Sequence, residues 1–364
     1  MLFRSQDKIP NEFLLEGGPV LVAALCKLFN WIKEKEAIPS LWRESRTVLL
    51  HKGGDRELLD NYRGITINSN VGKLFTRVIA KRMEDDVEER GLLGEIQHAF
   101  RRGRRGTDAL FVLNHIMESY QEEGKELITA FLDIRKAYDR VWRKGLWQVL
   151  KELGYGGRLV RVIQALYKDL GTVLQLGSVE TRRISISVGL KQGCVLSPLV
   201  FALYIRKIGL EILRTGMGAR IGDQRIPGLF FADDMVLFGQ SKEEMQQLLA
   251  VVAQEGTKLK LEFNVKKSKV MTNGQVEKGQ RWELGEGQGE KERTLEEVED
   301  YKYLGVTVRA VGSVFGTHAM NMVKKARRVA GVVKLTANDS CNIAEVGRRA
   351  WEAVARPAVI FGAE

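Results

Sequence analysis

The chain has 364 residues, of which 44% are hydrophobic and 28% are charged, and this balance excludes a chain that is disordered throughout. At about 150 residues per domain, the length predicts roughly two or three domains or subdomains. Lysine and arginine (57) exceed aspartate and glutamate (46) by 11, and so large a basic excess indicates a polyanionic partner, most often nucleic acid.

The sequence gives no sign of a membrane segment or an export signal. No stretch reaches the roughly 18–20 consecutive apolar residues that a membrane helix needs, and the apolar run of residues 19–32 contains Lys27. The three cysteines, Cys26, Cys194 and Cys341, form no C-x-x-C pair. We therefore expect no membrane partner, no secretion, no disulfide framework and no zinc site, and an intracellular location that is nuclear, cytoplasmic or both.

Two early elements have strong local patterns. Residues 127–132 form an apolar strand pattern that ends at Asp133, before a basic stretch. Ser197 and Pro198 have the character of an N-cap and a first-turn proline, which predicts an apolar helix over residues 199–213.

A hairpin is expected further along the chain. Residues 229–231 and 235–238 are two apolar strand patterns, and Ala232, Asp233 and Asp234 lie between them. We expect the two strands to pair and to present both carboxylates at or beside the turn.

The region after this hairpin mixes helix, loop and strand patterns. Ser241 and Glu244 form a capping box that predicts a helix ending at Gly256. From Gln275 to Asp300, glycines are interleaved with many glutamates, which predicts a solvated loop or linker between two packed regions. Helices mixed with hairpin-linked strands favour an α+β fold class over a doubly wound sheet.

Three aspartates stand at the ends of these strand patterns. Adjacent aspartates such as Asp233 and Asp234 are costly to keep charged between apolar strands unless a cation lies between them, although a solvated turn is the plain alternative. Asp133 adds a third carboxylate from a second strand end. Two strand ends of this kind can hold two Mg²⁺ ions about 3.5–4 Å apart, the arrangement used for in-line phosphoryl or nucleotidyl displacement.

Eight motifs follow one another along the chain: IPSLWRESRTVLLHKGGD, NYRGITINSNVGKLFTRVIAKRM, QHAFRRGRRGTDALF, FLDIRKAYDRVW, GLKQGCVLSPLVFALYI, FFADDMVLF, LEFNVKKSKVM and YKYLGV. In this order they resemble the reverse transcriptase region of non-long-terminal-repeat retrotransposons (long interspersed elements), from about Ile9 to Gly362. The resemblance implies a right-hand polymerase whose palm is an antiparallel sheet packed on helices. It implies N-terminally truncated fingers over 1–126, a palm over 127–308 and a partial helical thumb over 309–364.

The resemblance also implies an activity. A member of this family is an RNA-directed DNA polymerase that adds deoxynucleotides to a primer 3′-hydroxyl by two-metal nucleotidyl transfer. The implied cofactor is Mg²⁺, as two ions, with Mn²⁺ as the alternative metal, and Asp133, Asp233 and Asp234 match the metal-binding triad. The implied partners are an RNA template, a DNA primer and deoxynucleoside triphosphates, whereas the oligomeric state is not implied.

Two alternatives to this activity stay open. The first is a catalytically inactive RNA-binding remnant, which the truncation and Ala99, in place of a usual glycine, favour and the intact aspartate triad opposes. The second is an RNA-dependent RNA polymerase, which shares the palm and which Tyr138 opposes.

Five residues match nucleotide-binding positions of the family. Tyr138 lies where the family places the aromatic residue under the sugar, and a ring there would clash with a 2′-hydroxyl; an ordinary buried tyrosine is the alternative. Gln192 and Gly193 match the nucleotide-binding glutamine and its glycine, against the alternative of a plain turn. Arg63 and Lys52 fall in the fingers region whose basic side chains contact the triphosphate, although each is also compatible with a generic surface cation.

Other matched residues are expected to contact nucleic acid. Gln97 and the arginines Arg101, Arg102 and Arg104 match a template-contacting segment, in which basic side chains bind backbone phosphates. A solvated basic loop is the alternative. Asp139 is expected to be a helix-start or turn residue rather than a ligand.

The last matched motifs concern the leaving group and the primer. Lys267 matches the lysine proposed to protonate the leaving pyrophosphate, with Lys266 and Lys269 as close competitors. Tyr303 and Gly305 match the hairpin that grips the primer end, with an ordinary strand turn as the alternative. A basic amphipathic helix after this hairpin, with an apolar stripe from Met322 to Val333, fits a thumb, with a plain solvated basic face as the alternative.

Overall fold

The computed structural model describes residues 7–274, 281–285 and 293–325, together with residues 327, 348, 349 and 352. The chain forms two compact units, each assembled from separate segments. Unit 1 comprises Met1–Gly94, Arg135–Lys207 and Gly256–Leu261, and unit 2 comprises Glu95–Ile134, Ile208–Glu255 and Glu262–Glu364. None of the described helices combines the length and the apolar character needed to cross a membrane.

Unit 1 contains a sheet of five strands in the order β2-β1-β4-β5, with β6 also paired to β4. Its strands are β1 (Glu44–His51), β2 (Tyr62–Ile67), β4 (Leu170–Leu176), β5 (Val179–Glu180) and β6 (Ile184–Ile186). Its helices are α1 (Asn11–Glu16), α2 (Gly18–Lys35), α3 (Ser40–Arg43), α4 (Asn70–Glu89), α6 (Arg143–Glu152) and α7 (Gly157–Tyr167), with a 3₁₀ turn, η1 (Leu59–Asn61). The strand β1 is antiparallel to β2 and parallel to β4, so unit 1 has a mixed sheet.

Helix α4 shows how the sequence builds the core of unit 1. The Ser69 hydroxyl accepts a hydrogen bond from the Gly72 amide (2.9 Å) and so caps the first turn. Four buried apolar residues then recur every fourth position: Phe75, Ile79, Met83 and Val87. Phe75 packs against the ring of Phe29, with centroids 5.1 Å apart, which joins α4 to α2.

Unit 2 contains a sheet of six strands in the order β12-β13-β11-β3-β10-β9 and two separate hairpins, β7–β8 and β14–β15. The sheet strands are β3 (Ile128–Asp133), β9 (Gly228–Phe231), β10 (Asp234–Gly239), β11 (Lys269–Thr272), β12 (Trp282–Glu283) and β13 (Thr294–Glu297). The hairpin strands are β7 (Ala219–Ile221), β8 (Gln224–Ile226), β14 (Asp300–Tyr303) and β15 (Val306–Arg309). Helix α5 (Gly106–Glu122) belongs to this unit, and α8 (Ser197–Arg214) and α9 (Lys242–Lys258) contribute residues to both units.

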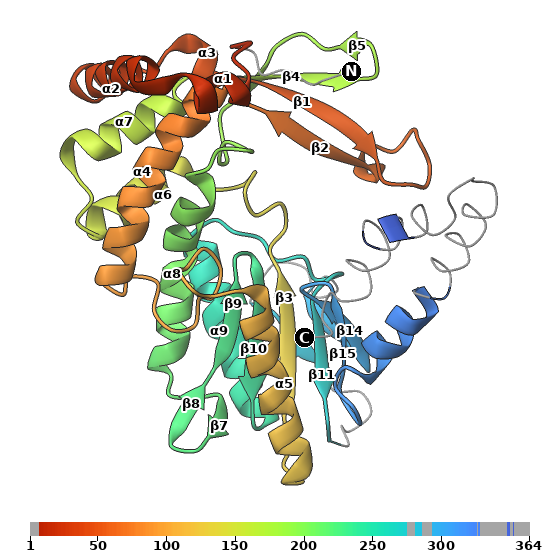
Figure 1. The fold of residues 1–364 in the computed structure, drawn as a ribbon. Coiled ribbons are helices and arrows are strands. Elements are labelled where there is room, and N and C mark those ends of the chain that lie inside the picture. The colour runs from red at the N-terminus through yellow and green to blue at the C-terminus, as the bar shows by residue number, and fades with distance from the viewer. Residues whose placement is uncertain are drawn as a thin grey trace, which may run out of the picture. The chain divides into compact units, whose positions relative to one another are not determined.

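One face of the unit 2 sheet carries an apolar core. Phe131 on β3, with Val236 and Phe238 on β10, packs with α5 and with the β14–β15 hairpin. The ring of Tyr301 stacks on Phe131 with centroids 4.4 Å apart. Figure 1 shows α5 lying over β3 and its neighbouring strands. Because side chains alternate along a strand, Asp133 lies on the same face of β3 as Phe131.

The predicted strand at 127–132 and the predicted hairpin are confirmed. β3 ends at Asp133, and β9 and β10 are antiparallel neighbours with Asp234 paired to Phe231. This register leaves Ala232 and Asp233 as a two-residue loop. Apolar patterning was enough here because both strands are short, buried and adjacent in the sequence.

Two predicted helix ends are wrong. α8 begins at Ser197 itself, because the Ser197 hydroxyl donates to the Lys191 carbonyl (2.8 Å) instead of capping the helix. α9 runs past Gly256 to Lys258. Lys260, with φ of 54°, adopts the left-handed conformation after this helix, and the Leu261 amide donates to the Gly256 carbonyl (2.9 Å).

The prediction of a solvated linker over residues 275–300 is also wrong for the described part of that segment. β13 pairs in parallel with β11, and an ion pair joins Lys269 and Glu296 (2.6 Å) across the two strands. Trp282 on β12 is fully buried. Burial of one large aromatic ring and a strand pairing outweigh the polar composition on which the prediction rested.

Most of the predicted thumb lies outside the described residues. Residues 316–325 are helical, which includes Met322 of the predicted apolar stripe. The other members of that stripe lie outside the described residues. The boundaries of fingers, palm and thumb therefore stay predictions.

Candidate active site

Three carboxylates meet at one end of the unit 2 sheet. Asp133, the last residue of β3, is directly opposite Asp234, the first residue of β10. Directly opposed residues of antiparallel strands project from the same face with Cβ atoms about 4.5–5.5 Å apart. Asp233 is the second residue of the two-residue loop that joins β9 to β10, so it directly precedes Asp234. Strand pairing therefore gathers carboxylates from two distant parts of the chain.

Burial and mutual repulsion make these carboxylates hard to ionise. Burial raises the pKa of Asp133, and the nearby Lys267 ammonium partly offsets this effect. Burial also raises the pKa of Asp233 above its usual value. Burial raises the pKa of Asp234 to about 6, and the charges of Asp233 and Asp133 add to this shift. Since these groups must share one small region, a bound cation would relieve the repulsion among them.

The carboxylates supply the donor atoms that Mg²⁺ prefers, because this hard cation binds oxygen ligands. In the part of the chain that the structure describes, no group of three or more His, Cys, Asp or Glu side chains is placed so that it could hold a metal ion. Mg²⁺ usually keeps several waters and is bound by one or two carboxylates plus substrate phosphates, rather than by an all-protein cage. The three aspartates therefore fit Mg²⁺ in donor chemistry, as a site that substrate would complete.

The segment after α9 holds Asp133 in place. The backbone amide of Asn264 donates to the backbone carbonyl of Asp133 (2.8 Å). The backbone amide of Asp133 donates to the Ser268 hydroxyl (3.0 Å). Lys267 Nζ lies 3.9 Å from Asp133 Oδ2. Lys269, which the sequence offers as an alternative proton donor, instead forms an ion pair with Glu296 on β13 (2.6 Å). Sequence reasoning missed Asn264 and Ser268, although both lie within the matched motif that contains Lys267.

In unit 1, Gln192 has a defined side-chain orientation. Its Nε2 donates to Asp139 Oδ1 (2.6 Å), and its Oε1 accepts from the Thr66 hydroxyl (3.3 Å). The Asn68 side chain donates to the Gln192 carbonyl (2.7 Å). Asp139 lies in a turn, as predicted, but its bond to Gln192 gives it a role that sequence reasoning missed. The signal available in the sequence was only its proximity to Tyr138.

Gly193 needs to be glycine where it stands. Its φ of +73° is left-handed, and a Cβ atom there would lie 2.7 Å from Asn68 Nδ2 and 2.8 Å from the Thr66 carbonyl oxygen. The chain therefore approaches β2 more closely at this point than a side chain would allow.

Three other residues of unit 1, Tyr138, Arg63 and Lys52, are predicted to bind the nucleotide. The half-buried Tyr138 ring stacks on Phe201, with centroids 4.8 Å apart. Arg63 and Lys52 are exposed near the end of the β1–β2 hairpin. Because side chains alternate along a strand, Arg63 projects from the face of β2 opposite to Thr66, which contacts Gln192.

The resemblance predicts that Gln97 contacts the template, and the structure contradicts this for its side chain. Gln97 is only 2% exposed. Its Oε1 accepts hydrogen bonds from the amides of Ala99 (3.0 Å) and Ala232 (3.2 Å). The carboxamide oxygen is thus engaged within unit 2, and sequence reasoning had no local signal for this because both the position and the partner depend on packing.

The predicted primer contact through the Tyr303 side chain is also corrected. Tyr303 is 2% exposed, because it packs in the apolar core on Phe131. Gly305, with φ of 88°, lies in the turn of this hairpin. Contact between this turn and a primer stays a prediction. Tyr301 was missed: it stacks on Phe131, and burial together with the charge of Asp234 raises its pKa to about 12.

Two of the three predicted template arginines, Arg101 and Arg104, form ion pairs within unit 2. Arg104 pairs with Glu95 through its guanidinium and also donates to the Glu95 carbonyl (3.0 Å). Arg101 lies 3.7 Å from the same carboxylate. The hydrogen bond from Arg104 is the main reason that the pKa of Glu95 is lowered. Arg102 is exposed, so it keeps the most accessible side chain of the three predicted arginines.

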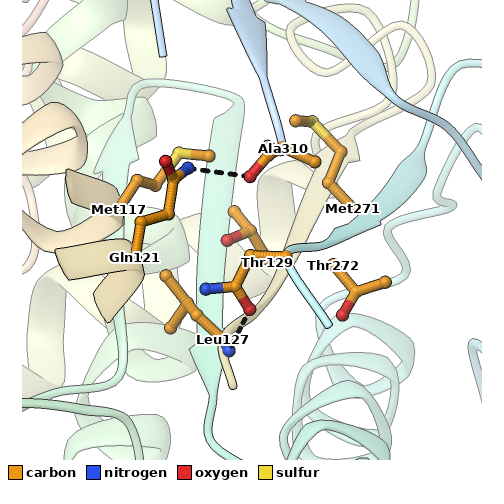
Figure 2. A pocket seen from close by; sticks show the side chains of 8 residues that line it. Met117, Gln121, Leu127, Thr129, Met271, Thr272 and Ala310 are labelled. Atoms are coloured by element: carbon orange, nitrogen blue, oxygen red, sulfur yellow. Dashed lines mark hydrogen bonds between the residues drawn. The ribbon is translucent and has the colours of Figure 1, made fainter. Parts of the chain in front are cut away.

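A small cavity in unit 2 includes none of these residues. Its volume is about 10 Å³, roughly the space of one water molecule. Figure 2 shows Gln121, from α5, donating to the Ala310 carbonyl (2.9 Å) beside it, with Met117 and Met271 in the wall. Thr129, near the start of β3, also lines it, whereas Asp133 ends that strand. The cavity is therefore separate from the carboxylates.

Comparison with known proteins decides the family. Residues 50–308, well over half of the chain, match the family model described as "Reverse transcriptase (RNA-dependent DNA polymerase)". The chain belongs to the reverse transcriptase family. Members of this family generally use divalent metal ions and bind an RNA template.

The chain is similar to retrotransposon proteins of other organisms. It is 32% identical over 237 residues to "Retrovirus-related Pol polyprotein from type-1 retrotransposable element R2" of Popillia japonica, covering 64% of this chain and 32% of the relative. It is 23% identical over 315 residues to "RNA-directed DNA polymerase from mobile element jockey" of Drosophila melanogaster, covering 83% of this chain and 33% of the relative. The predicted resemblance to non-long-terminal-repeat retrotransposons is confirmed, and the chain spans about a third of the length of these relatives.

The fold of this family member also matches a solved structure. Apo telomerase from Candida tropicalis, truncated from its C-terminal domain, superposes with a TM-score of 0.51 and 10% identity. The match covers 78% of this chain and 58% of that chain. At this identity the likeness concerns the fold alone, and it confirms the predicted α+β right-hand polymerase.

Proposed function

We propose that this chain is an RNA-directed DNA polymerase core, which extends a DNA primer on an RNA template. The observation that carries the proposal is the register of β3 and β10, which places Asp133 opposite Asp234 with Asp233 beside them. These three residues would hold two Mg²⁺ ions, with Mn²⁺ as the alternative metal. Bound there, the ions would activate the primer hydroxyl and neutralise charge on the phosphates.

The proposed reaction joins the primer to the α-phosphate of a deoxynucleoside triphosphate. The 3′-hydroxyl gives up its proton to solvent water, and its oxygen forms the new bond to the α-phosphorus. The bond from the α-phosphorus to the bridging oxygen of the pyrophosphate breaks. We assign to Lys267 the proton that the leaving pyrophosphate takes up. Its ammonium lies 3.9 Å from Asp133, and its side chain is 68% exposed, so the proton can be replaced from solvent.

The residues of unit 1 are proposed to select the nucleotide. Tyr138 would exclude a ribose 2′-hydroxyl, and Gln192, with Gly193, would seat the sugar and base. The bond to Asp139 supports this role because it fixes which way the amide points. Arg63 and Lys52 are proposed to contact the triphosphate, to which arginine offers a bidentate fork and lysine a point charge.

The proposed nucleic-acid contacts belong to unit 2. Arg102, with Arg101 and Arg104 beside it, would contact template phosphates, and the turn at Gly305 would contact the primer. In the parent element this activity would copy element RNA into DNA inside the cell, in the nucleus, the cytoplasm or both.

Primer extension tests the proposal. Purified chain is given poly(A) RNA, an oligo(dT) primer, dTTP and Mg²⁺, beside a double Asp233→Asn, Asp234→Asn control. We expect extension by the wild type and loss of at least about 10³-fold in the control. If both proteins bind the primed template and neither extends the primer, the chain is an RNA-binding remnant and the proposed enzyme activity is wrong.

A second arm tests nucleotide choice. We expect dTTP to be incorporated much faster than UTP, and Tyr138→Ala to narrow this difference by admitting the 2′-hydroxyl. Faster incorporation of UTP by the wild type would favour an RNA-dependent RNA polymerase.

A further inference from the structure

The turn that carries the aspartates has an unfavourable backbone. Its two central residues are Ala232 and Asp233, and two-residue hairpin loops need a left-handed residue at their first central position. Ala232 occupies that position with φ of 58°. Glycine adopts this conformation without strain, whereas the Cβ of alanine makes it costly. Some contact from outside the hairpin must therefore favour this turn.

Gln97 makes that contact. Its Oε1 accepts from the Ala232 amide (3.2 Å) and from the Ala99 amide (3.0 Å). The side chain is buried, so little water competes for the oxygen. One acceptor thus links the left-handed residue of the turn to a segment far away in the sequence.

The backbone around Gln97 is itself anchored to β9. The Phe230 amide donates to the Ile96 carbonyl (2.8 Å), and the His98 amide donates to the Phe230 carbonyl (2.8 Å). Gln97 and Phe230 accordingly form a parallel bridge along the outer edge of this strand. The Gln97 side chain is therefore held against the strand that leads into the turn.

We propose that Gln97 is a positioning residue for the reaction, which holds the Ala232–Asp233 turn so that Asp233 and Asp234 stay in register with Asp133. The inference rests on the proposed polymerase activity and replaces the template contact predicted for the Gln97 side chain. Loss of its acceptor frees the turn to leave the left-handed conformation. Because catalytic groups must be held closely, a displacement of about 1 Å can lower the rate by about 10²-fold.

The test separates the rate of extension from template affinity. Gln97→Met keeps the side-chain volume and removes the acceptor. We expect the rate at saturating primed template to fall by about tenfold to 10²-fold, and the Kd for primed template to stay within about twofold. An unchanged rate at saturation with a clearly weaker Kd would overturn the proposal and restore the template contact.

Two further variants sharpen this result. Ala232→Gly, added to Gln97→Met, should recover at least about threefold of the lost rate, because glycine needs no support at a positive φ. Gln121→Met is the matched control. It makes the same substitution in the same unit and likewise removes a side-chain bond to the backbone, here one that Gln121 Nε2 donates to the Ala310 carbonyl (2.9 Å). Its rate should therefore stay within about twofold of wild type. A comparable loss of rate in Gln121→Met, or no recovery with Ala232→Gly, would overturn the proposal.

A third variant covers the case in which Gln97→Met fails to fold. Gln97→Glu keeps an oxygen acceptor of similar reach and adds a negative charge. If Gln97 faced the template, this charge would repel phosphate and weaken template binding by well over tenfold at low salt. For a buried positioning residue we expect a Kd within about twofold of wild type.

Hydrogen exchange gives a measure that does not depend on turnover. Peptides that span residues 229–238 should exchange faster in Gln97→Met than in wild type, while they remain unchanged in Gln121→Met. If the wild type fails to extend a primer, the proposed function fails, yet faster exchange would still support the link between Gln97 and the turn. Equal exchange in Gln97→Met and wild type would overturn the link itself.

Discussion

Asp133 and Asp234 face each other directly across β3 and β10, although α6, α7 and α8 lie between them in the sequence. Their shared face leaves like charges close together, and the pKa of each is raised, chiefly by burial. This arrangement is unfavourable at neutral pH without a cation. We therefore expect a bound metal ion to stabilise unit 2.

The first prediction concerns that stabilisation. Mg²⁺ should raise the melting temperature of the wild type, and a concentration of about 100 times the Kd would stabilise the folded state by about 2.7 kcal/mol. The Asp233→Asn, Asp234→Asn double variant should gain much less. Without metal, it should melt at or above the wild-type temperature, because two repelling charges are gone. Thermal melts with Mg²⁺ and with EDTA measure both effects, and equal gains in the two proteins would count against the metal assignment.

The second prediction separates the candidate lysines. Lys267→Ala should lower the extension rate by about 10²-fold or more, because it removes the ammonium beside Asp133. Lys266→Ala, at the exposed neighbouring position, should change the rate by less than about threefold. A pH–rate profile provides the check, since loss of a general acid should remove the fall in rate at alkaline pH. A similar loss in both variants would show that general charge, rather than one proton donor, is being measured.

The third prediction tests the orientation of Gln192. Asp139→Ala removes the acceptor that lies 2.6 Å from Gln192 Nε2, so only the longer bond from the Thr66 hydroxyl (3.3 Å) still orients the amide. We expect KM for dTTP to rise by about fivefold to tenfold with a smaller change in kcat, as for loss of about one hydrogen bond. Asp139→Asn keeps an oxygen at that position and should retain most of the affinity. Steady-state kinetics with varied dTTP measure KM for each variant. If both variants had the wild-type KM, Asp139 would not orient Gln192 for nucleotide binding.

The fourth prediction concerns backbone space at Gly193. Gly193→Ala should destabilise unit 1 by about 3 kcal/mol, because the new methyl group meets Asn68 and the Thr66 carbonyl in a left-handed conformation. Gly91→Ala is the matched control: its φ is 58°, but no atom lies within 4 Å of its Cβ. It should cost only about 1 kcal/mol. Denaturant unfolding compares the two, and equal losses would mean that φ alone matters.

The fifth prediction is a pH dependence away from the candidate site. The Tyr155 hydroxyl donates to Asp86 Oδ2 (2.6 Å), and this bond is the main reason that the pKa of Asp86 lies below its ordinary value of 3.8. The folded state then binds fewer protons than the unfolded chain, so this stabilisation is present above pH 3.8 and is lost as the pH falls through the lowered pKa.

Tyr155→Phe should therefore cost about 1 kcal/mol at neutral pH, because Asp86 is only partly shielded from water. The difference from wild type should shrink below about pH 4. Unfolding free energies measured from pH 3 to pH 7 give the comparison. A difference that stays constant over this range would mean that packing, and not the hydrogen bond to the carboxylate, explains the loss.

Local patterns in the sequence predicted much of the chemistry. Strand-length apolar runs end at Asp133 and flank Asp233 and Asp234. Such runs predict a strand and the turn that follows it, because both depend on residues close together in the sequence. The ordered motifs predicted the family. The same reasoning failed at Ser197, whose hydroxyl bonds to a carbonyl instead of capping, and at Trp282, whose burial no local composition could indicate.

The sequence by itself determined which residues carry charge, amide and ring at the ends of short elements, and hence the type of reaction that they can support. Only the tertiary structure decided which of them meet: Asp133 with Asp234, Gln192 with Asp139, and Gln97 with Ala232. It also buried Gln97 and Tyr303, which the motifs place at a nucleic-acid surface. The physical reason is that side-chain alternation and turn geometry are local, whereas register and burial depend on which distant segments pack together.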